Sequence, residues 1–498
     1  MAKKLLAIDQ GTTGSTAIVS TLEGEVLGKT NVEFEQHFPK PGWVEHDAEQ
    51  IWRSVEASVE GALAAARVAG TEIGAIGITN QRETTLVWDR KSGKPVHRAI
   101  VWQCRRTAPT CDRLKAEGAE ASVRKKTGLV IDAYFSGTKI AWILDEVSGA
   151  RARADKGDLA FGTIDSFVVW RLTGGEVHAT DVTNASRTLL MDLATRTWDD
   201  EMLKLFAVPA SVLPKIVPSA GPIGTTKGVG FLPDGIPITG IAGDQQAALF
   251  GQACFTEGDA KCTYGTGAFA LMNIGKTPTP SQHGLVTTVG WQIGDDVTYA
   301  LEGSAFIAGA AVQWLRDGLG LIKSAPEIEE LARKVASSEG VAFVPALAGL
   351  GAPYWDQSAR GTIVGLTRGT TAAHLARATL EGIAFEVWDL LEAMTKDAGR
   401  PLASLRVDGG ASKNDLLVQF QADIAKVKVV RPVEVESTGR GAAMLAGIGA
   451  GLTDLAAASK MVKVDRTFEP VFTASEREEH IARWRRAIAQ TRGPRAAS

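Results

Sequence analysis

Cysteine is scarce in this chain of 498 residues, which contains only Cys104, Cys111, Cys254 and Cys262. None of the four belongs to a Cys-x-x-Cys pair, so the sequence indicates neither a zinc site nor a disulfide scaffold. Such sparse cysteine usage is typical of proteins in a reducing compartment. We therefore expect the protein to be cytoplasmic.

An excess of charge and a long apolar run are also missing. The formal net charge of −3 is too small to indicate binding to nucleic acid or to an anionic membrane surface. The apolar run near the N-terminus covers only residues 5–8, which is too short for a signal peptide or a membrane span. We therefore expect no nucleic-acid partner and no membrane insertion.

The length and the hydrophobic patterns favour a large α/β protein. A chain of 498 residues is too long for a single core, so two or more large domains are expected. Apolar strands at residues 73–79 and 236–241 alternate with helical periodicity, which is strongest at 371–393. Asp47 is predicted to cap a helix that ends near Ala69, in a capping box with Gln50.

The first glycine-rich turn follows the strand at residues 5–8. Asp9 ends that strand, and a Gly/Thr-rich turn leads into a second strand at 16–20. Gly11 and Gly14 allow close backbone approach, so the N–H groups of this hairpin can face an anion. Asp9 would then hold Mg²⁺ near phosphates through water. An ordinary hairpin turn explains the same pattern.

The pattern of strand followed by a glycine turn returns twice. Residues 260–269 again run from a strand into a Gly/Thr turn, and residues 405–414 run from a strand through Gly-Gly into a helix. The helix that follows can direct its N-terminus at a phosphate. Because two similar hairpins each head about half of the chain, ligands are expected between the halves. We place the domain boundary near Gly251, which gives domains 1–251 and 252–498.

Polar side chains follow two of the predicted strands directly. Residues 80–84 come after the strand at 73–79, where open α/β sheets place ligands. Arg82 and Glu83 in this segment can also be an ordinary solvated pair. Asp244 follows another strand at the start of an apolar helix, where its negative charge is stabilised. Helix capping alone accounts for an aspartate in this place.

The order of the three turns resembles the phosphate-1, phosphate-2 and adenosine motifs of the actin/hexokinase/Hsp70-type ATPase fold. This resemblance implies two ribonuclease H-like domains, of the actin-like ATPase type, that flank a cleft. No Walker A sequence is present, so the chain is not a P-loop enzyme.

A closer resemblance covers essentially the whole chain. Segments 135–139 and 361–369 are similar to the two signatures of the FGGY carbohydrate kinases. Four further segments resemble the subgroup of that family that phosphorylates glycerol. These segments are residues 40–47, 78–84, 100–106 and 240–246.

The resemblance implies the residues of a site. The glycerol hydroxyls would be bound by Arg82, Glu83, Tyr134, Asp244 and Gln245. Trp102 and Phe269 would form an apolar wall against the glycerol carbons. The positions that match the family's nucleotide-binding residues are Thr12, Thr13, Gly14, Thr266, Gly309, Gln313, Gly410 and Asn414. Asp9 matches the acidic residue near Mg²⁺.

The resemblance also implies a reaction. Asp244 would act as general base while a terminal glycerol hydroxyl attacks the γ-phosphorus of MgATP in line, which yields sn-glycerol 3-phosphate. This reaction is the first step of glycerol catabolism. Relatives are usually dimers or tetramers, so a homodimer or homotetramer is expected by analogy.

Two departures from the family pattern stand out. Gly14 and Thr16 replace a serine and an arginine of the first hairpin, so a cation near the phosphates is missing. Relatives inhibited by fructose 1,6-bisphosphate carry a basic loop where this chain has residues 229–235, which contain no lysine or arginine. We expect no such inhibition through this loop.

Two other functions are compatible with parts of the pattern. One is an FGGY kinase for a pentulose or another polyol, although the aromatic pair Trp102 and Phe269 favours a three-carbon substrate. The other is a non-catalytic ATP-dependent module of the same fold. In that case Asp244 and the pair Arg82 and Glu83 have no evident purpose.

Overall fold

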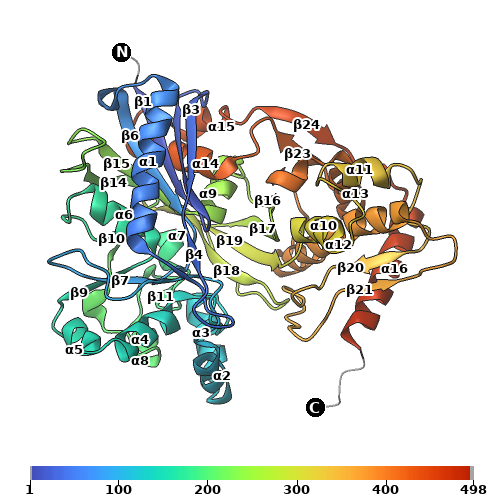
Figure 1. Ribbon diagram of the computed structural model, residues 1–498, viewed down its shortest axis with the longest axis horizontal. Coiled ribbons are helices and arrows are strands. Elements are labelled where there is room, and N and C mark those ends of the chain that lie inside the picture. Colours follow the sequence, from blue (N-terminus) through green and yellow to red (C-terminus); the bar gives the residue numbers. More distant parts are fainter. Residues whose placement is uncertain (1–2, 494–498) are drawn as a thin grey trace.

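One sheet of thirteen strands runs through the computed structural model, which describes residues 3–493 (Figure 1). Its strands are, from one edge to the other, β24 (Val464–Phe468), β23 (Val429–Pro432), β22 (Ser404–Asp408), β16 (Asp259–Tyr264), β17 (Ala268–Gly275), β19 (Asp296–Ala305), β18 (Val286–Ile293), β14 (Ala220–Thr225), β15 (Pro237–Gly243), β6 (Ile73–Asn80), β1 (Lys4–Gln10), β2 (Gly14–Ser20) and β3 (Val26–Glu33). The predicted α/β class is confirmed.

The large sheet divides where β14 meets β18. All of its strands up to β15 lie on one side, and all from β16 onward lie on the other. A single residue pair, Ala220 and Ile293, joins β14 to β18. The two groups of strands belong to the two lobes seen in Figure 1. This division supports the boundary near Gly251, which we keep as a proposal.

The two halves repeat one arrangement of strands. β1 pairs antiparallel with β2 and parallel with β6. In the same way β16 pairs antiparallel with β17 and parallel with β22. The first and second glycine turns therefore occupy equivalent places in the two halves.

Helices cover the sheet in both lobes (Figure 1). They are α1 (Ala48–Ala66), α2 (Ala108–Ala116), α3 (Glu120–Thr127), α4 (Ser136–Glu146), α5 (Ala150–Asp155), α6 (Ile164–Leu172), α7 (Val182–Ala185), α8 (Asp200–Leu205), α9 (Asp244–Gly251), α10 (Gly309–Asp317), α11 (Glu327–Ala332), α12 (Ala372–Ala398), α13 (Asp415–Ala425), α14 (Ser437–Gly449), α15 (Leu455–Ser459) and α16 (Ala474–Arg492).

Short strands form small sheets outside the large one. They are β4 (Gln36–His37), β5 (Glu45–His46) and β8 (Ala99–Ile100) in one sheet, and the pairs β7 (Leu86–Asp89) with β9 (Leu159–Gly162), β10 (Ala179–Asp181) with β13 (Lys215–Val217), β11 (Met191–Asp192) with β12 (Thr197–Trp198), and β20 (Ala342–Val344) with β21 (Thr362–Val364).

Helix α14 links the halves, because it belongs to the second half of the chain but packs on strands of the first. It contacts β1, β6 and β15, and it crosses α9. Glycines permit this approach: a Cβ added at Gly77 would lie 2.0 Å from the carbonyl oxygen of Ala442. The helix therefore lies directly on the strand backbone.

The structure confirms some local predictions and corrects others. Asp47 caps α1 as predicted, with its carboxylate accepting from the N–H groups of Glu49 and Gln50. The predicted capping box is incomplete, because the Gln50 carboxamide oxygen accepts instead from the N–H of Glu35. Helix α1 also ends at Ala66, since Arg67 adopts a left-handed backbone conformation with φ of 55°.

The longest helix is placed correctly by its periodicity, and α12 begins directly after Thr371. Among residues 3–493 no helix is both long enough and apolar enough to cross a membrane.

Candidate active site

Three parallel strands bring the predicted polar residues to one edge of the sheet. β1, β6 and β15 are neighbours, with Asp9 beside Thr79 and Asn80 beside Gly243. Asp9 lies near the end of β1, Arg82 follows β6, and Asp244 follows β15. Their carboxyl ends therefore meet at the edge where open α/β sheets bind ligands.

Arg82 is the most heavily bonded of these side chains. It is buried, and its Nε lies 3.2 Å from Oδ1 of Asp244. Its Nη1 donates to Gln246 over 3.0 Å, and its Nη2 lies 3.4 Å from the hydroxyl of Tyr134. The solvated-pair interpretation of Arg82 and Glu83 is wrong, because both side chains are almost fully buried.

Glu302 anchors Arg82 from the second half of the chain. Its Oε2 accepts from Nη1 of Arg82 at 2.5 Å, and its Oε1 accepts from Nη2 at 2.9 Å. Oε1 also accepts from Arg187, whose Nε donates to Glu83 over 2.7 Å. Although burial opposes ionisation, Arg187 and Arg82 hold the pKa of Glu302 at about 2. The two halves are thus joined by a buried network of two arginines and two glutamates.

Sequence reasoning missed both Arg187 and Glu302. Glu302 lies within the buried stretch of β19, and a carboxylate inside an apolar strand needs a buried partner. This need for a buried partner is the signal in the sequence that could have identified Glu302. Arg187 follows α7 in a turn and carries no comparable signal.

An aromatic pair lies beside Arg82. The rings of Trp102 and Tyr134 meet edge to face, with centroids 5.6 Å apart. The indole N–H of Trp102 donates to the hydroxyl of Thr12 over 3.0 Å, which connects this pair to the first glycine turn. Phe269 lies on β17 opposite Ser304. Within residues 3–493 its ring forms no aromatic pair, and the apolar wall expected from Trp102 and Phe269 stays a prediction.

Asp244 begins α9 and retains access to solvent. Its side chain is 30% exposed, and its Oδ1 accepts from the N–H of Gln245. Burial raises the pKa of Asp244 above the usual aspartate value, against the opposing charges of Arg82 and Lys261. A carboxylate with a raised pKa accepts a proton more readily than an ordinary aspartate does.

The first two glycine turns form tight backbone structures. In the first, the N–H of Gly11 donates to the carbonyl of Gly14 over 2.8 Å. In the second, the N–H groups of Ala308 and Ala310 donate to the carbonyl of Thr266, so this turn lies against the start of α10. Gln313 on α10 is exposed.

The third turn touches the second. Gly409 has a φ of +82°, and a Cβ there would lie 2.5 Å from the carbonyl oxygen of Tyr264. A Cβ at Gly410 would meet nothing within 4 Å, so its backbone is open to a ligand. The Asn414 side chain caps α13 by accepting from the N–H of Leu417.

Asp9 is the residue expected near Mg²⁺, so its surroundings show whether a cation fits there. Burial, reinforced by Asp244 and Glu436, raises the pKa of Asp9 to about 8, although Lys29 opposes the shift. A carboxylate with so high a pKa is stabilised in its charged form by a nearby cation. No group of three or more acidic, histidine or cysteine side chains within residues 3–493 is arranged to hold a metal. Asp9 therefore fits Mg²⁺ held mainly by water and phosphate oxygens.

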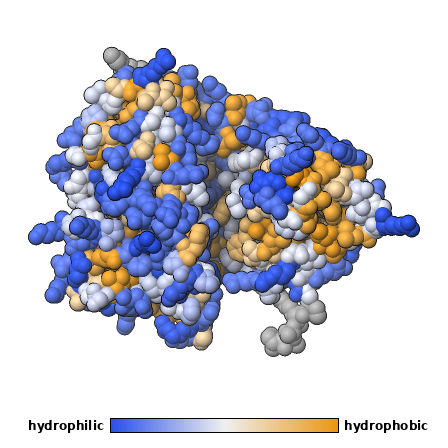
Figure 2. All heavy atoms as spheres, viewed as in Figure 1, coloured by the Kyte–Doolittle hydropathy of each residue, from blue (hydrophilic) through white to orange (hydrophobic). Residues whose placement is uncertain are grey.

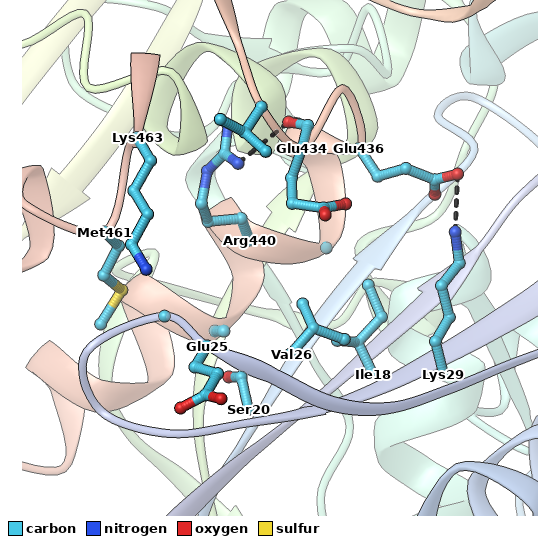
Figure 3. A pocket seen from close by; sticks show the side chains of 14 residues that line it. Ile18, Ser20, Glu25, Val26, Lys29, Glu434, Glu436, Arg440, Met461 and Lys463 are labelled. Atoms are coloured by element: carbon cyan, nitrogen blue, oxygen red, sulfur yellow. Dashed lines mark hydrogen bonds and ion pairs between the residues drawn. The ribbon is translucent and has the colours of Figure 1, made fainter. Parts of the chain in front are cut away.

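Figure 3 shows a cavity of about 280 Å³ between the halves. The β2–β3 hairpin forms one wall, and the start of α14 with the segment before it forms the other. Lys29 reaches across to Glu436, with 2.6 Å between ammonium and carboxylate. None of the predicted site residues lines this cavity.

The fold and the site together define a two-lobed α/β enzyme with a polar centre between its halves, and Figure 2 shows the surface hollowed between the lobes. The N-terminal domain of the FGGY family of carbohydrate kinases matches residues 4–251, and the C-terminal domain of that family matches residues 260–450. The chain belongs to the FGGY family of carbohydrate kinases.

Two relatives and one solved structure are similar to this chain over nearly its whole length. A protein of Myxococcus xanthus named glycerol kinase is 57% identical over 490 residues, which cover 98% of this chain and 99% of that protein. A glycerol kinase of Deinococcus radiodurans is 58% identical over 491 residues, which cover 98% and 97%. The crystal structure of Plasmodium falciparum glycerol kinase with ADP matches with a TM-score of 0.93 and 38% identity, and covers 98% of both chains.

Proposed function

We propose that this protein transfers the γ-phosphoryl group of ATP to glycerol and forms sn-glycerol 3-phosphate. Near full-length similarity to proteins named glycerol kinase supports the substrate, and the related structure with ADP supports the nucleotide. The observation that carries the proposal is the position of Asp244, which is partly exposed and lies 3.2 Å from Arg82. A proton acceptor and a hydroxyl-binding cation are thus side by side.

The proposed mechanism assigns proton transfer to Asp244. Its carboxylate accepts the proton of a terminal glycerol hydroxyl as that oxygen attacks the γ-phosphorus. Arg82 holds the carboxylate, while Glu302 and Arg187 hold Arg82 and Glu83 in place. Mg²⁺ near Asp9 would supply positive charge next to the phosphate oxygens.

The remaining site assignments are part of the same proposal. Arg82, Glu83, Tyr134 and Gln245 bind the glycerol hydroxyls, because a triol needs paired donors and acceptors. Trp102 and Phe269 contact its carbons. The nucleotide is bound by the three glycine turns and by α10, through Thr12, Thr13, Gly14, Thr266, Gly309, Gln313, Gly410 and Asn414.

Compartment and assembly are also proposed. The four cysteines are free and buried, which is compatible with a reducing cytoplasm. By analogy with relatives we expect a homodimer or homotetramer, and light scattering after size-exclusion chromatography measures the mass directly.

An acceptor panel tests the proposed function. ATP turnover is measured with glycerol, with pentuloses and other polyols, and without an acceptor. The expected result is one ADP and one sn-glycerol 3-phosphate per turnover, with the highest kcat/KM for glycerol. A higher kcat/KM for a pentulose, or ATP turnover that ignores the acceptor, contradicts the proposal.

A further inference from the structure

Lys261 is a fully buried lysine that the mechanism above does not use. It lies on β16, and its side chain has no exposed surface. Within residues 3–493 no carboxylate is close enough to form an ion pair with it. An ammonium without an ion-pair partner is costly to bury, whereas an apolar side chain of similar length is not. Folding alone therefore gives no reason for a lysine here.

The partners of Lys261 lie on two elements. Its Nζ donates to Oε1 of Gln245 at the start of α9, and to the hydroxyl of Thr263 over 2.9 Å. Thr263 lies two residues further along β16, on the same face of the strand. β16 leads directly into the Gly265-Thr266 turn. One ammonium thus connects the acceptor residue Gln245 with the strand that carries the second glycine turn.

The ammonium also decides which way the Gln245 carboxamide faces. Lysine carries only donors, so the amide oxygen must be the atom that faces it. The amide nitrogen then points away from Lys261, and within the described residues no acceptor is assigned to it. Gln245 is half-buried and adjacent to Asp244, so two N–H donors remain for a ligand beside the proposed base.

Several ionisable groups influence the charge of Lys261. Burial lowers the pKa of Lys261 below the usual lysine value, whereas the carboxylates of Asp408 on β22 and Asp244 on α9 favour the charged ammonium. Arg82 disfavours the charged form of Lys261, and the positive charge of Lys261 in turn lowers the pKa of Glu302. The thiols of Cys262 and Cys254 also lie within its field. The positive charge of Lys261 lowers the pKa of Asp244, which burial raises.

We propose that Lys261 is a positioning residue for the phosphoryl acceptor. It holds the Gln245 carboxamide with its N–H donors directed at an acceptor hydroxyl, and in its protonated form it places a positive charge near Asp244. This inference rests on the proposed function and adds to it a residue that acts through Gln245 and Asp244.

Two substitutions of Lys261 distinguish the loss of its hydrogen-bond donor from the loss of its positive charge. Lys261→Met removes both, whereas Lys261→Gln keeps an N–H donor for Gln245 and removes only the charge. Lys276→Met is the matched control, because Lys276 is an exposed lysine whose partner Asp296 is also exposed. Glycerol affinity is measured by calorimetry without nucleotide, KM and kcat by ADP release, and folding by the thermal midpoint.

Lys261→Met is expected to weaken glycerol binding by roughly tenfold, the effect of losing one charge-assisted hydrogen bond. It also moves the acid limb of kcat/KM to higher pH, because the pKa of Asp244 rises when the neighbouring positive charge is removed. Lys261→Gln restores glycerol binding but keeps the shifted limb. In a Gln245→Ala background, the Met and Gln variants bind glycerol equally. Lys276→Met behaves as the wild type.

Several outcomes overturn the inference. Wild-type glycerol affinity and an unmoved acid limb in Lys261→Met show that the lysine positions nothing. A difference between the Met and Gln variants that persists in Gln245→Ala shows that it does not act through Gln245. If Lys261→Met does not fold, an unmoved acid limb in Lys261→Gln is sufficient to refute the role of the charge. Absence of glycerol-dependent turnover in the wild type contradicts the proposed function itself.

Discussion

Glu302 is the residue on which the buried acceptor network depends. It accepts three hydrogen bonds from Arg82 and Arg187 and is almost fully buried. Its removal leaves two guanidinium groups without their shared counter-charge. The network shows how a carboxylate of the second half determines the position of the proposed glycerol-binding arginine.

Glu302→Gln is therefore expected to destabilise the fold by about 3–5 kcal/mol, the cost of breaking a buried ion pair. It also raises the glycerol KM, because Arg82 loses the carboxylate that fixes it. Urea unfolding and glycerol kinetics measure the two effects. Asp296→Asn, which removes an exposed partner of Lys276, is the control and leaves both unchanged. An unaltered unfolding midpoint in Glu302→Gln contradicts the assignment.

The protonation of Asp244 predicts the pH dependence of the reaction. A proton acceptor must be ionised, so activity falls as the pH falls through the pKa of Asp244. Burial raises that pKa, so the acid limb of kcat/KM is expected above the pH of about 4 at which an ordinary aspartate titrates. Circular dichroism over the same range checks that the protein stays folded. Full activity at pH 4 argues against Asp244 as the base.

At the scale of secondary-structure elements, the crossing of α9 and α14 is unusually close. A Cβ added at Gly441 would lie 1.8 Å from the carbonyl oxygen of Ala247, and one at Gly251 would lie 2.0 Å from that of Ser437. Both obstacles are backbone atoms, which cannot rotate away. Helices α9 and α14, one from each half of the chain, therefore touch through glycine on each side.

Gly441→Ala is expected to lower stability by about 1–3 kcal/mol, because the added methyl forces the helices apart. Thermal and urea unfolding measure the loss. Gly230→Ala serves as the control, since a Cβ there meets nothing within 4 Å. If both variants unfold at the wild-type midpoint, the crossing is less tightly packed than described.

The elements that could be predicted from the sequence are those with local signals. The strand before Asp9 and its Gly/Thr turn show their form within a dozen residues, and Asp47 marks the start of α1. Small residues around position 305 carry no such signal: they continue β19 to Ala305, and α10 begins only at Gly309. Ladder hydrogen bonds to β17 override the helical tendency of these residues. Ser136 begins α4, and its hydroxyl donates to the carbonyl of Glu83, a contact far away in the chain that no local pattern indicates.

At the scale of the whole molecule, the buried network was not predictable, because Arg82 and Glu302 are 220 residues apart in the chain. No local pattern specifies such a pair. A second feature that the sequence did not reveal is the source of positive charge near Thr16, where the family pattern has an arginine. Lys29 pairs with Ile18 in the register of β2 and β3, so its side chain shares the face of Thr16, and its charge opposes the raised pKa of Asp9.

Lys29→Met is expected to raise the KM for ATP several-fold and to leave the glycerol KM unchanged, because the positive charge of Lys29 acts on Asp9 at the first hairpin. The effect weakens at high salt, since Lys29 and Glu436 are both partly exposed. Initial rates at varied ATP and salt measure it, with Lys276→Met as the control. An equal rise in both KM values indicates a general distortion instead.

The central claim is that Asp244 takes the proton from glycerol during phosphoryl transfer. The most direct test is single-turnover transfer from ATP to glycerol by Asp244→Asn, with glycerol affinity measured separately by calorimetry. The account predicts that the rate falls by roughly 10²–10⁴-fold, the usual contribution of a general base, while glycerol affinity stays within an order of magnitude. Transfer by Asp244→Asn at the wild-type rate would contradict it.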